Sequence, residues 1–184
     1  MIHRKNAPIM FVFDLDNTLI MTDDANNLAY ADAVQTVVGV KPQLATSTRY
    51  TRNDLRTSFP QLTDDQFDRI IETKQGLFGS YIDKTVLNVN LARILRMLSQ
   101  NGNETILLTS CHRKRAIQLC KHYDIHQFFS HHYYYEDCQY DKYSFLRSEG
   151  FDLQSVVLFE NDQISSNEAV QKGIVKDNII MVSF

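Results

Sequence analysis

One stretch near the amino terminus indicates both the fold class and the position of a candidate active site: Ile9-Met10-Phe11-Val12-Phe13-Asp14-Leu15-Asp16-Asn17-Thr18. Its first five residues are apolar, and a run of this length and composition is typical of a buried parallel strand. Two carboxylates, Asp14 and Asp16, follow at once, so they emerge at the carboxyl end of that strand. In an open α/β sheet, ligands bind at this edge. Two acids one residue apart can divide the work there, one attacking or holding a cation and the other moving a proton.

Four further apolar runs of strand length follow, separated by helical patterns or by a long insert. Alternation of this kind predicts an α/β fold with a parallel sheet that is covered on both faces. The segments 142–149 and 165–171 have a suitable length for crossover helices. The expected strands are residues 9–13, 105–108, 128–133, 156–159 and 179–182.

Residues 22–85 interrupt the alternation, because their patterns are helical throughout. Thr63-Asp64-Asp65-Gln66 matches a capping box, and apolar residues follow at three- and four-residue spacing, so a long amphipathic helix is expected to begin there. Upstream, an apolar stripe closed by Gly39 predicts a first helix. We therefore predict a core domain of residues 1–21 and 86–184, with residues 22–85 as a small helical cap.

A polar stretch of this insert, residues 46–59, carries Arg49, Arg52 and Arg56. Their spacing places them on one face of a helix. Arginine is nearly always exposed, so a solvent-facing surface is the simpler interpretation. The alternative is that this face binds an anionic substrate, since a guanidinium pairs in bidentate fashion with phosphate or carboxylate.

The chain of 184 residues is 43% hydrophobic with a formal charge of −3, which suits one well-cored domain with a small insert. Charges of both signs are scattered, so we expect no nucleic-acid partner. The basic residues 1–5 precede an apolar run too short for a signal peptide or a membrane span. We therefore expect a cytoplasmic protein, with a non-cleaved export signal as the alternative. Three cysteines without paired or C-x-x-C spacing argue against disulfides and structural zinc.

With Thr18 and the apolar pair Leu19-Ile20, the two aspartates form a D-x-D-x-T pattern that resembles motif I of the haloacid dehalogenase-like (HAD) phosphohydrolases. In that family the first aspartate attacks phosphorus and the second acts as general acid and base. The resemblance therefore implies Asp14 as the nucleophile and Asp16 as the proton carrier. The dehalogenase branch lacks the second aspartate, so Asp16 favours phosphoryl transfer.

Two further motifs occur in the order that the family uses. Thr109, with Ser110 beside it, ends the expected second strand and resembles motif II, which holds the transferring phosphoryl group. Lys142 follows the third strand and resembles motif III, which balances the charge of nucleophile and phosphate. Alone, either residue would be interpreted as an ordinary strand end or a surface lysine. Their order after Asp14 is what makes the resemblance specific.

The segment after the fourth strand, Glu160-Asn161-Asp162, resembles motif IV, which supplies acids for Mg²⁺. The resemblance implies that Mg²⁺ is held by Asp14, the backbone carbonyl of Asp16 and Asp162, with Asn167 outside them. Few protein ligands are needed, because Mg²⁺ retains several waters. The chain departs from the family pattern at Asn161 and Asn167, where a small residue or an acid is usual. This loss of ligand charge keeps a non-catalytic binding or regulatory role as an alternative function.

The resemblance spans residues 14–167 and implies a Rossmann-like three-layer sandwich with a five-stranded parallel sheet and a helical cap inserted after motif I. It implies a Mg²⁺-dependent phosphoric monoester hydrolase that works through an aspartyl-phosphate intermediate. We expect a small phosphorylated metabolite as the substrate, since a lid excludes water and bulky groups. A phosphotyrosine side chain on a phosphoprotein is the alternative substrate.

Overall fold

The computed structural model describes residues 8–44 and 48–184, which form two compact units. The core unit contains the residues up to Ile20 together with Leu87–Phe184, and the helical insert contains Met21–Val86. The basic opening residues 1–5 and the start of the polar stretch at residue 46 lie outside the described residues. That the insert acts as a cap over a site stays a prediction.

The core unit is built on a five-stranded parallel sheet in the order β5-β4-β1-β6-β7. The first strand of the chain, β1, lies at the centre and pairs with β4 on one side and β6 on the other. This confirms the predicted α/β sandwich and its parallel sheet. The strands are β1 (Met10–Phe13), β4 (Glu104–Leu108), β5 (His131–Tyr133), β6 (Val156–Glu160) and β7 (Ile179–Met181).

The third predicted strand begins later than expected, at His131 instead of residue 128. The preceding residues His126–Phe128 form a 3-10 helix, and Phe129 then packs edge-on against Phe13 of the central strand with ring centroids 6.0 Å apart. A short apolar run cannot by its pattern alone distinguish a strand from a buried turn. The prediction was therefore right about the element and wrong about its start.

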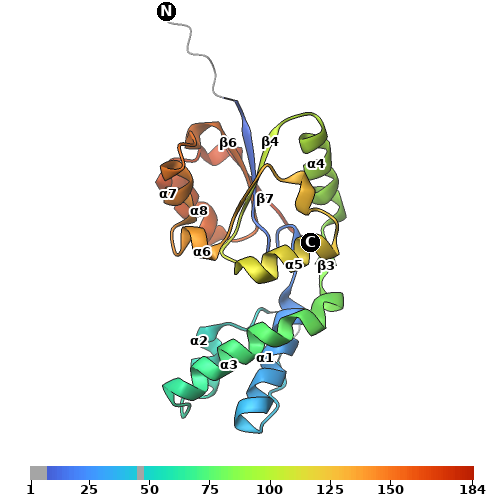
Figure 1. Cartoon of the computed structure of the whole chain (residues 1–184). Coiled ribbons are helices and arrows are strands. Elements are labelled where there is room, and N and C mark those ends of the chain that lie inside the picture. Colours follow the sequence, from blue (N-terminus) through green and yellow to red (C-terminus); the bar gives the residue numbers. More distant parts are fainter. Residues whose placement is uncertain (1–7, 45–47) are drawn as a thin grey trace, which may run out of the picture. The chain divides into compact units, whose positions relative to one another are not determined.

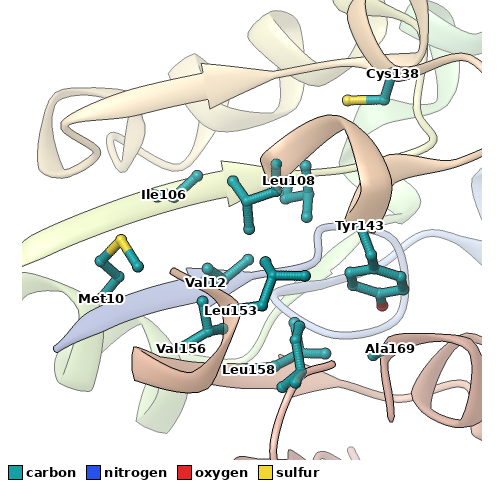
Figure 2. Close-up of a cluster of buried hydrophobic side chains, with 12 residues drawn as sticks. Met10, Val12, Ile106, Leu108, Cys138, Tyr143, Leu153, Val156, Leu158 and Ala169 are labelled. Carbon is teal, nitrogen blue, oxygen red and sulfur yellow. The ribbon is translucent and has the colours of Figure 1, made fainter. Parts of the chain in front are cut away.

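Helices cover both faces of the sheet, with α7 and α8 on one side and α4 on the other (Figure 1). Alternate residues of the strands, such as Val12, Leu108 and Leu158, form a buried apolar cluster with residues of α7 and α8 (Figure 2). Successive strand residues point to opposite faces, which produces this alternation. The α-helices of this unit are α4 (Val89–Gln100), α5 (Arg113–His122), α6 (Tyr135–Cys138), α7 (Lys142–Ser148) and α8 (Gln163–Lys172), and further 3-10 helices span Leu153–Ser155 and Lys176–Asn178.

The helical insert has an apolar core of its own, formed by residues such as Tyr30, Val34, Leu55 and Ile70. The chain passes between the two units at β2 (Ile20–Met21) and β3 (Val86–Leu87). The helices of the insert are α1 (Asp23–Val38), α2 (Arg52–Ser58) and α3 (Asp64–Leu77), followed by a 3-10 helix over Phe78–Lys84.

Local capping signals of the insert are confirmed. The first helix ends at Gly39 in the left-handed conformation, with φ of 81°. The Thr63 side chain accepts a hydrogen bond from the Gln66 backbone, which completes the predicted capping box. Across residues 8–44 and 48–184, no helix combines the length and the apolar character needed to cross a membrane.

The predicted common face of the three arginines is wrong for Arg49. The helix α2 begins only at Arg52, so Arg49 lies before it, where its guanidinium donates to Asp23 Oδ1 at 3.0 Å. The cause is local, because the amide of Asn27 binds the backbone of the segment at Thr48 and Tyr50 and holds it against α1.

Arg56 does lie on α2, but it already has partners inside the insert. Its guanidinium donates to Asp64 Oδ1 at 2.9 Å and lies 3.8 Å from the centroid of the Phe67 ring. Arg52 is exposed at the first position of the helix. The three arginines therefore have different surroundings, and their role in substrate binding stays a prediction.

Candidate active site

Asp14 lies at the carboxyl end of the central strand. Its backbone N–H donates to Phe159 O at 3.0 Å, which extends the pairing of β1 with β6 by one residue. The chain then turns sharply, because the carbonyl of Leu15 accepts hydrogen bonds from three of the following backbone N–H groups. Asn17 adopts a left-handed φ of 60°, which asparagine tolerates better than most residues. This turn leaves the side chains of both Asp14 and Thr18 buried.

A single lysine lies between two buried carboxylates. Lys142 Nζ donates to Asp14 Oδ1 at 3.0 Å and to Glu160 Oε2 at 2.9 Å. Lys142 is the first residue of α7, and the Asp141 side chain caps that helix by accepting from its third backbone N–H. The structure thus brings together Asp14 and Lys142, which are 128 positions apart in the sequence.

Glu160 is a site residue to which the sequence analysis assigned no role. Its Oε2 accepts from Lys142, from the Tyr143 hydroxyl at 3.1 Å and from the Ser165 hydroxyl at 2.7 Å. Its Oε1 accepts from the next two backbone N–H groups, at 3.0 and 3.2 Å. Burial alone would raise the pKa of Glu160, but Lys142 and these hydrogen bonds lower it below its usual value. Glu160 was expected just after the fourth strand, where an acid is ordinarily exposed, but it is the buried last residue of β6.

The loop after β6 approaches Asp14 through Asn161. The Thr18 hydroxyl lies 3.2 Å from Asp14 Oδ2 and 3.0 Å from Asn161 Oδ1, so it links the two residues. Asp162 is the N-cap residue of α8. Its Oδ2 accepts a hydrogen bond from a backbone N–H of the first turn at 2.7 Å. Asn167 is exposed, and its amide oxygen accepts from a side chain of its own helix. Of the three, Asn161 is the residue that the structure links to Asp14.

Thr109 lies at the same edge of the sheet. It follows β4 and lies two residues beyond Leu107, the last residue of β4 that pairs with β1. Its side chain is buried, and Oγ1 accepts from the backbone N–H of Cys111 at 3.0 Å. Ser110, between them, is exposed. The end of β4 and the end of β1 thus present Thr109 and Asp14 on one edge.

A second ion pair at this edge joins Asp16 to Arg115 of α5. The two side chains are 20% and 18% exposed, so the pair is mostly withdrawn from solvent. Arg115 Nε also donates to Cys111 Sγ at 2.8 Å. The sequence did not predict this contact, because a run of basic residues at the start of a helix is usually a solvent-exposed turn.

A sequence model of the haloacid dehalogenase-like hydrolases matches residues 11–175, a range that includes every residue of this edge described above. The chain belongs to this family. The resemblance noted from the motifs is thereby confirmed, and the protein is a HAD-like hydrolase. No curated protein sequence matches the chain.

Solved structures of similar fold support the same architecture. A predicted phosphoglycolate phosphatase from Haemophilus somnus is 17% identical, with a TM-score of 0.78 over 96% of this chain and 84% of that one. A HAD-like hydrolase from Streptococcus pneumoniae is 18% identical, with a TM-score of 0.74 over 91% and 82%. CbbY from Rhodobacter sphaeroides, in complex with phosphate, is 14% identical, with a TM-score of 0.73 over 97% and 87%. At these identities the likeness establishes the fold alone.

The electrostatics of this HAD-like hydrolase centre on Asp14. Burial raises the pKa of Asp14 to about 7, and the Glu160 carboxylate adds to the rise while the Lys142 ammonium opposes it. The two carboxylates share one ammonium, so the three groups carry a net charge of −1 when both acids are ionised. Burial alone would lower the pKa of Lys142, but the carboxylates of Asp14 and Glu160 raise it above its usual range. A further cation beside Asp14 would favour its ionised form, which is the form that can attack.

The oxygen atoms around Asp14 fit a Mg²⁺ ion that takes most of its ligands from water and substrate. The Asp14 carboxylate and the Asn161 amide supply hard oxygen donors, and both oxygens lie within hydrogen-bond distance of the Thr18 hydroxyl. Within the described ranges, no cluster of three or more His, Cys, Asp and Glu side chains is suited to hold a metal ion. Mg²⁺ sites that act on phosphates commonly use only one or two carboxylates together with phosphate oxygens. The residues present therefore fit this ion.

Proposed function

We propose that this HAD-like hydrolase is a phosphatase that cleaves a phosphomonoester through an aspartyl phosphate on Asp14. The observation that carries the proposal is the buried Asp14 carboxylate at the end of the central strand, held 3.0 Å from the Lys142 ammonium, which also contacts the buried Glu160 carboxylate. Nucleophile and cation must meet at one point to transfer a phosphoryl group, because the transition state spreads negative charge over its oxygens.

The residues that match the first three family motifs each have a role in this reaction. Asp14 attacks phosphorus, and the leaving oxygen takes a proton from Asp16. Asp16 then removes a proton from the water that cleaves the acyl phosphate, which restores both carboxyl groups. Lys142 balances the charge of the phosphoryl group and of Asp14. Thr109, with Ser110 beside it, binds phosphoryl oxygens at the end of β4.

We further propose Mg²⁺ as the cofactor. Asp14, the backbone carbonyl of Asp16 and the amide oxygen of Asn161 would hold it. When bound, it would supply positive charge next to the phosphoryl oxygens. The resemblance to motif IV implies Asp162 as the third Mg²⁺ ligand. Because the Asp162 carboxylate caps α8, we assign this place to Asn161.

A small phosphorylated metabolite is the proposed substrate, with the helical insert as the lid. Two of the structurally similar proteins support this choice by their names, one a predicted phosphoglycolate phosphatase and the other a protein in complex with phosphate. Closure of a lid excludes water from a phosphoryl-transfer site and selects against bulky substrates. Arg49, Arg52 and Arg56 of the insert remain candidates for contacts with an anionic group of the substrate.

The test is a panel of phosphorylated metabolites and phosphotyrosine peptides, incubated with the protein and Mg²⁺, with inorganic phosphate as the readout. We expect release from at least one metabolite, its loss on adding EDTA and its return with excess Mg²⁺. If the protein prefers the phosphotyrosine peptides, its substrate is a phosphoprotein instead of a small metabolite. Failure on every member of the panel would contradict the proposed function.

A further inference from the structure

The proton carrier of the proposed mechanism is held by a cation of its own. The Arg115 guanidinium donates through Nη2 to Asp16 Oδ2 and through Nε to Cys111 Sγ, the latter at 2.8 Å. Because a guanidinium is planar and rigid, contacts at two of its nitrogens define both its position and its orientation. Cys111 is only 2% exposed, so the anchoring sulfur cannot shift easily.

These contacts also connect Asp16 to the phosphoryl-binding edge. The backbone N–H of Cys111 donates to Thr109 Oγ1 at 3.0 Å, while its sulfur accepts from Arg115. Thr109, Cys111, Arg115 and Asp16 therefore form one continuous series of hydrogen bonds between the residue that would bind the phosphoryl group and the residue that would move the proton.

The same helix offers an internal comparison. Arg113, two residues earlier on α5, donates to Asp137 Oδ1 at 2.5 Å, and its guanidinium lies 4.6 Å from the centroid of the Tyr134 ring. The Arg113 side chain is 48% exposed, against 18% for Arg115. Desolvating an ion pair is unfavourable, so the mostly buried pair is the one that calls for a functional reason.

We propose that Arg115 is a positioning residue that fixes the Asp16 carboxylate for proton transfer to the leaving group, an inference that rests on the proposed function. Arg115 does not contact the reacting atoms in this role. A general acid and base contributes roughly 10²–10⁴-fold to a rate, and only while its carboxyl group stays within hydrogen-bond reach of the leaving oxygen. Without Arg115, Asp16 can rotate away from that oxygen.

A positioning role differs from a structural role in its dependence on the leaving group. An alkoxide leaves poorly unless it is protonated, so an alkyl phosphate depends strongly on Asp16. The 4-nitrophenolate anion leaves without a proton, so 4-nitrophenyl phosphate depends on it little. The ratio kcat/KM includes every step up to release of the alcohol, which makes it the right quantity to compare.

The experiment measures kcat/KM with Mg²⁺ for 4-nitrophenyl phosphate and for the alkyl phosphate that the wild type hydrolyses fastest. We expect Arg115→Met to lower the value for the alkyl phosphate by roughly ten- to a hundredfold, and that for the aryl phosphate by less than about threefold. Asp16→Asn should show the same selectivity. Arg113→Met, which removes the exposed arginine of the same helix, should stay within about twofold of the wild type on both substrates.

Two milder variants keep the test decisive if Arg115→Met does not fold. Arg115→Lys retains the charge and Cys111→Ala removes only the sulfur contact, and both should give a smaller loss with the same preference for the alkyl phosphate. Equal losses on both substrates, no loss, or a gain on the alkyl phosphate would each overturn the inference. A wild type inactive on all phosphates would instead overturn the proposed function, which distinguishes the two failures.

Discussion

The buried cluster around Lys142 in the core unit and the Arg56–Asp64 pair of the helical insert place charged side chains in different surroundings. In the core unit, Asp14, Lys142 and Glu160 have side chains only 10%, 11% and 2% exposed. In the insert, Arg56 and Asp64 have side chains 47% and 87% exposed, and they are eight residues apart in the sequence. Desolvating an ion costs several kcal/mol, whereas an exposed pair contributes about 0–1 kcal/mol. A buried cluster of this kind therefore calls for a functional reason, whereas an exposed pair does not.

Polar groups of the insert serve mainly its own fold. Thr51 and Asp54 form a capping box at α2, and Thr63 and Gln66 form another at α3. The Asn26 side chain donates to a backbone carbonyl of the segment that precedes α2. These interactions link residues close in sequence or on neighbouring helices. The core site instead joins residues from the ends of separate strands and helices, so its charges have no such local explanation.

The largest effect is expected from Lys142→Met, which leaves the buried carboxylates of Asp14 and Glu160 without their cation. We expect phosphate release to be lost and the free energy of unfolding to fall by about 3–5 kcal/mol. Urea unfolding and the phosphate assay measure the two quantities. Lys172→Met is the matched control, because Lys172 pairs with Asp141 on the surface of the same unit, and should cost about 0–1 kcal/mol. Similar losses for both lysines would remove the distinction between buried and exposed pairs.

Substitutions in the loop after β6 test which side chain of this loop binds Mg²⁺. Asn161→Asp adds a carboxylate beside Asp14, so we expect tighter Mg²⁺ binding by about tenfold or more, or roughly 1.4 kcal/mol, in calorimetric titrations without substrate. Asp162→Ala should keep the wild-type Mg²⁺ affinity and lower the free energy of unfolding by about 1 kcal/mol, because it removes a helix cap. Abolished Mg²⁺ binding in Asp162→Ala would instead support the ligand expected from the sequence.

In the insert, the effect is expected to depend on the substrate. Replacing Arg49, Arg52 and Arg56 together by alanine should lower kcat/KM for an anionic natural substrate by about tenfold, or roughly 1.4 kcal/mol. Hydrolysis of 4-nitrophenyl phosphate should stay near the wild-type rate, because this substrate offers no second anionic group. A loss of kcat/KM on both substrates would indicate a structural role for the arginines. No loss on either substrate would show that they do not contact the substrate.

Sequence patterns predicted the sheet, the insert and the helix caps because those features depend on local periodicity and on a few turn residues. The order of the motifs also pointed to Asp14 and Lys142, although 128 positions separate them. Arg115 was missed because its contact with Asp16 depends on the direction in which one turn of α5 faces. The sequence could not predict that Asn161 lies next to Thr18 while Asp162 caps α8, since a shift of one residue exchanges the two positions.

We predict that Asp14 carries the phosphoryl group during turnover. The most direct measurement is to quench the wild type with acid during hydrolysis of a good substrate and to locate the covalent phosphoryl group by peptide mass spectrometry. We predict that it is found on Asp14, and that Asp14→Asn, with an unchanged circular dichroism spectrum, shows neither this modification nor turnover, because an amide cannot form the acyl phosphate. A phosphoryl group on another residue, or a folded Asp14→Asn variant that turns over at the wild-type rate, would contradict the claim.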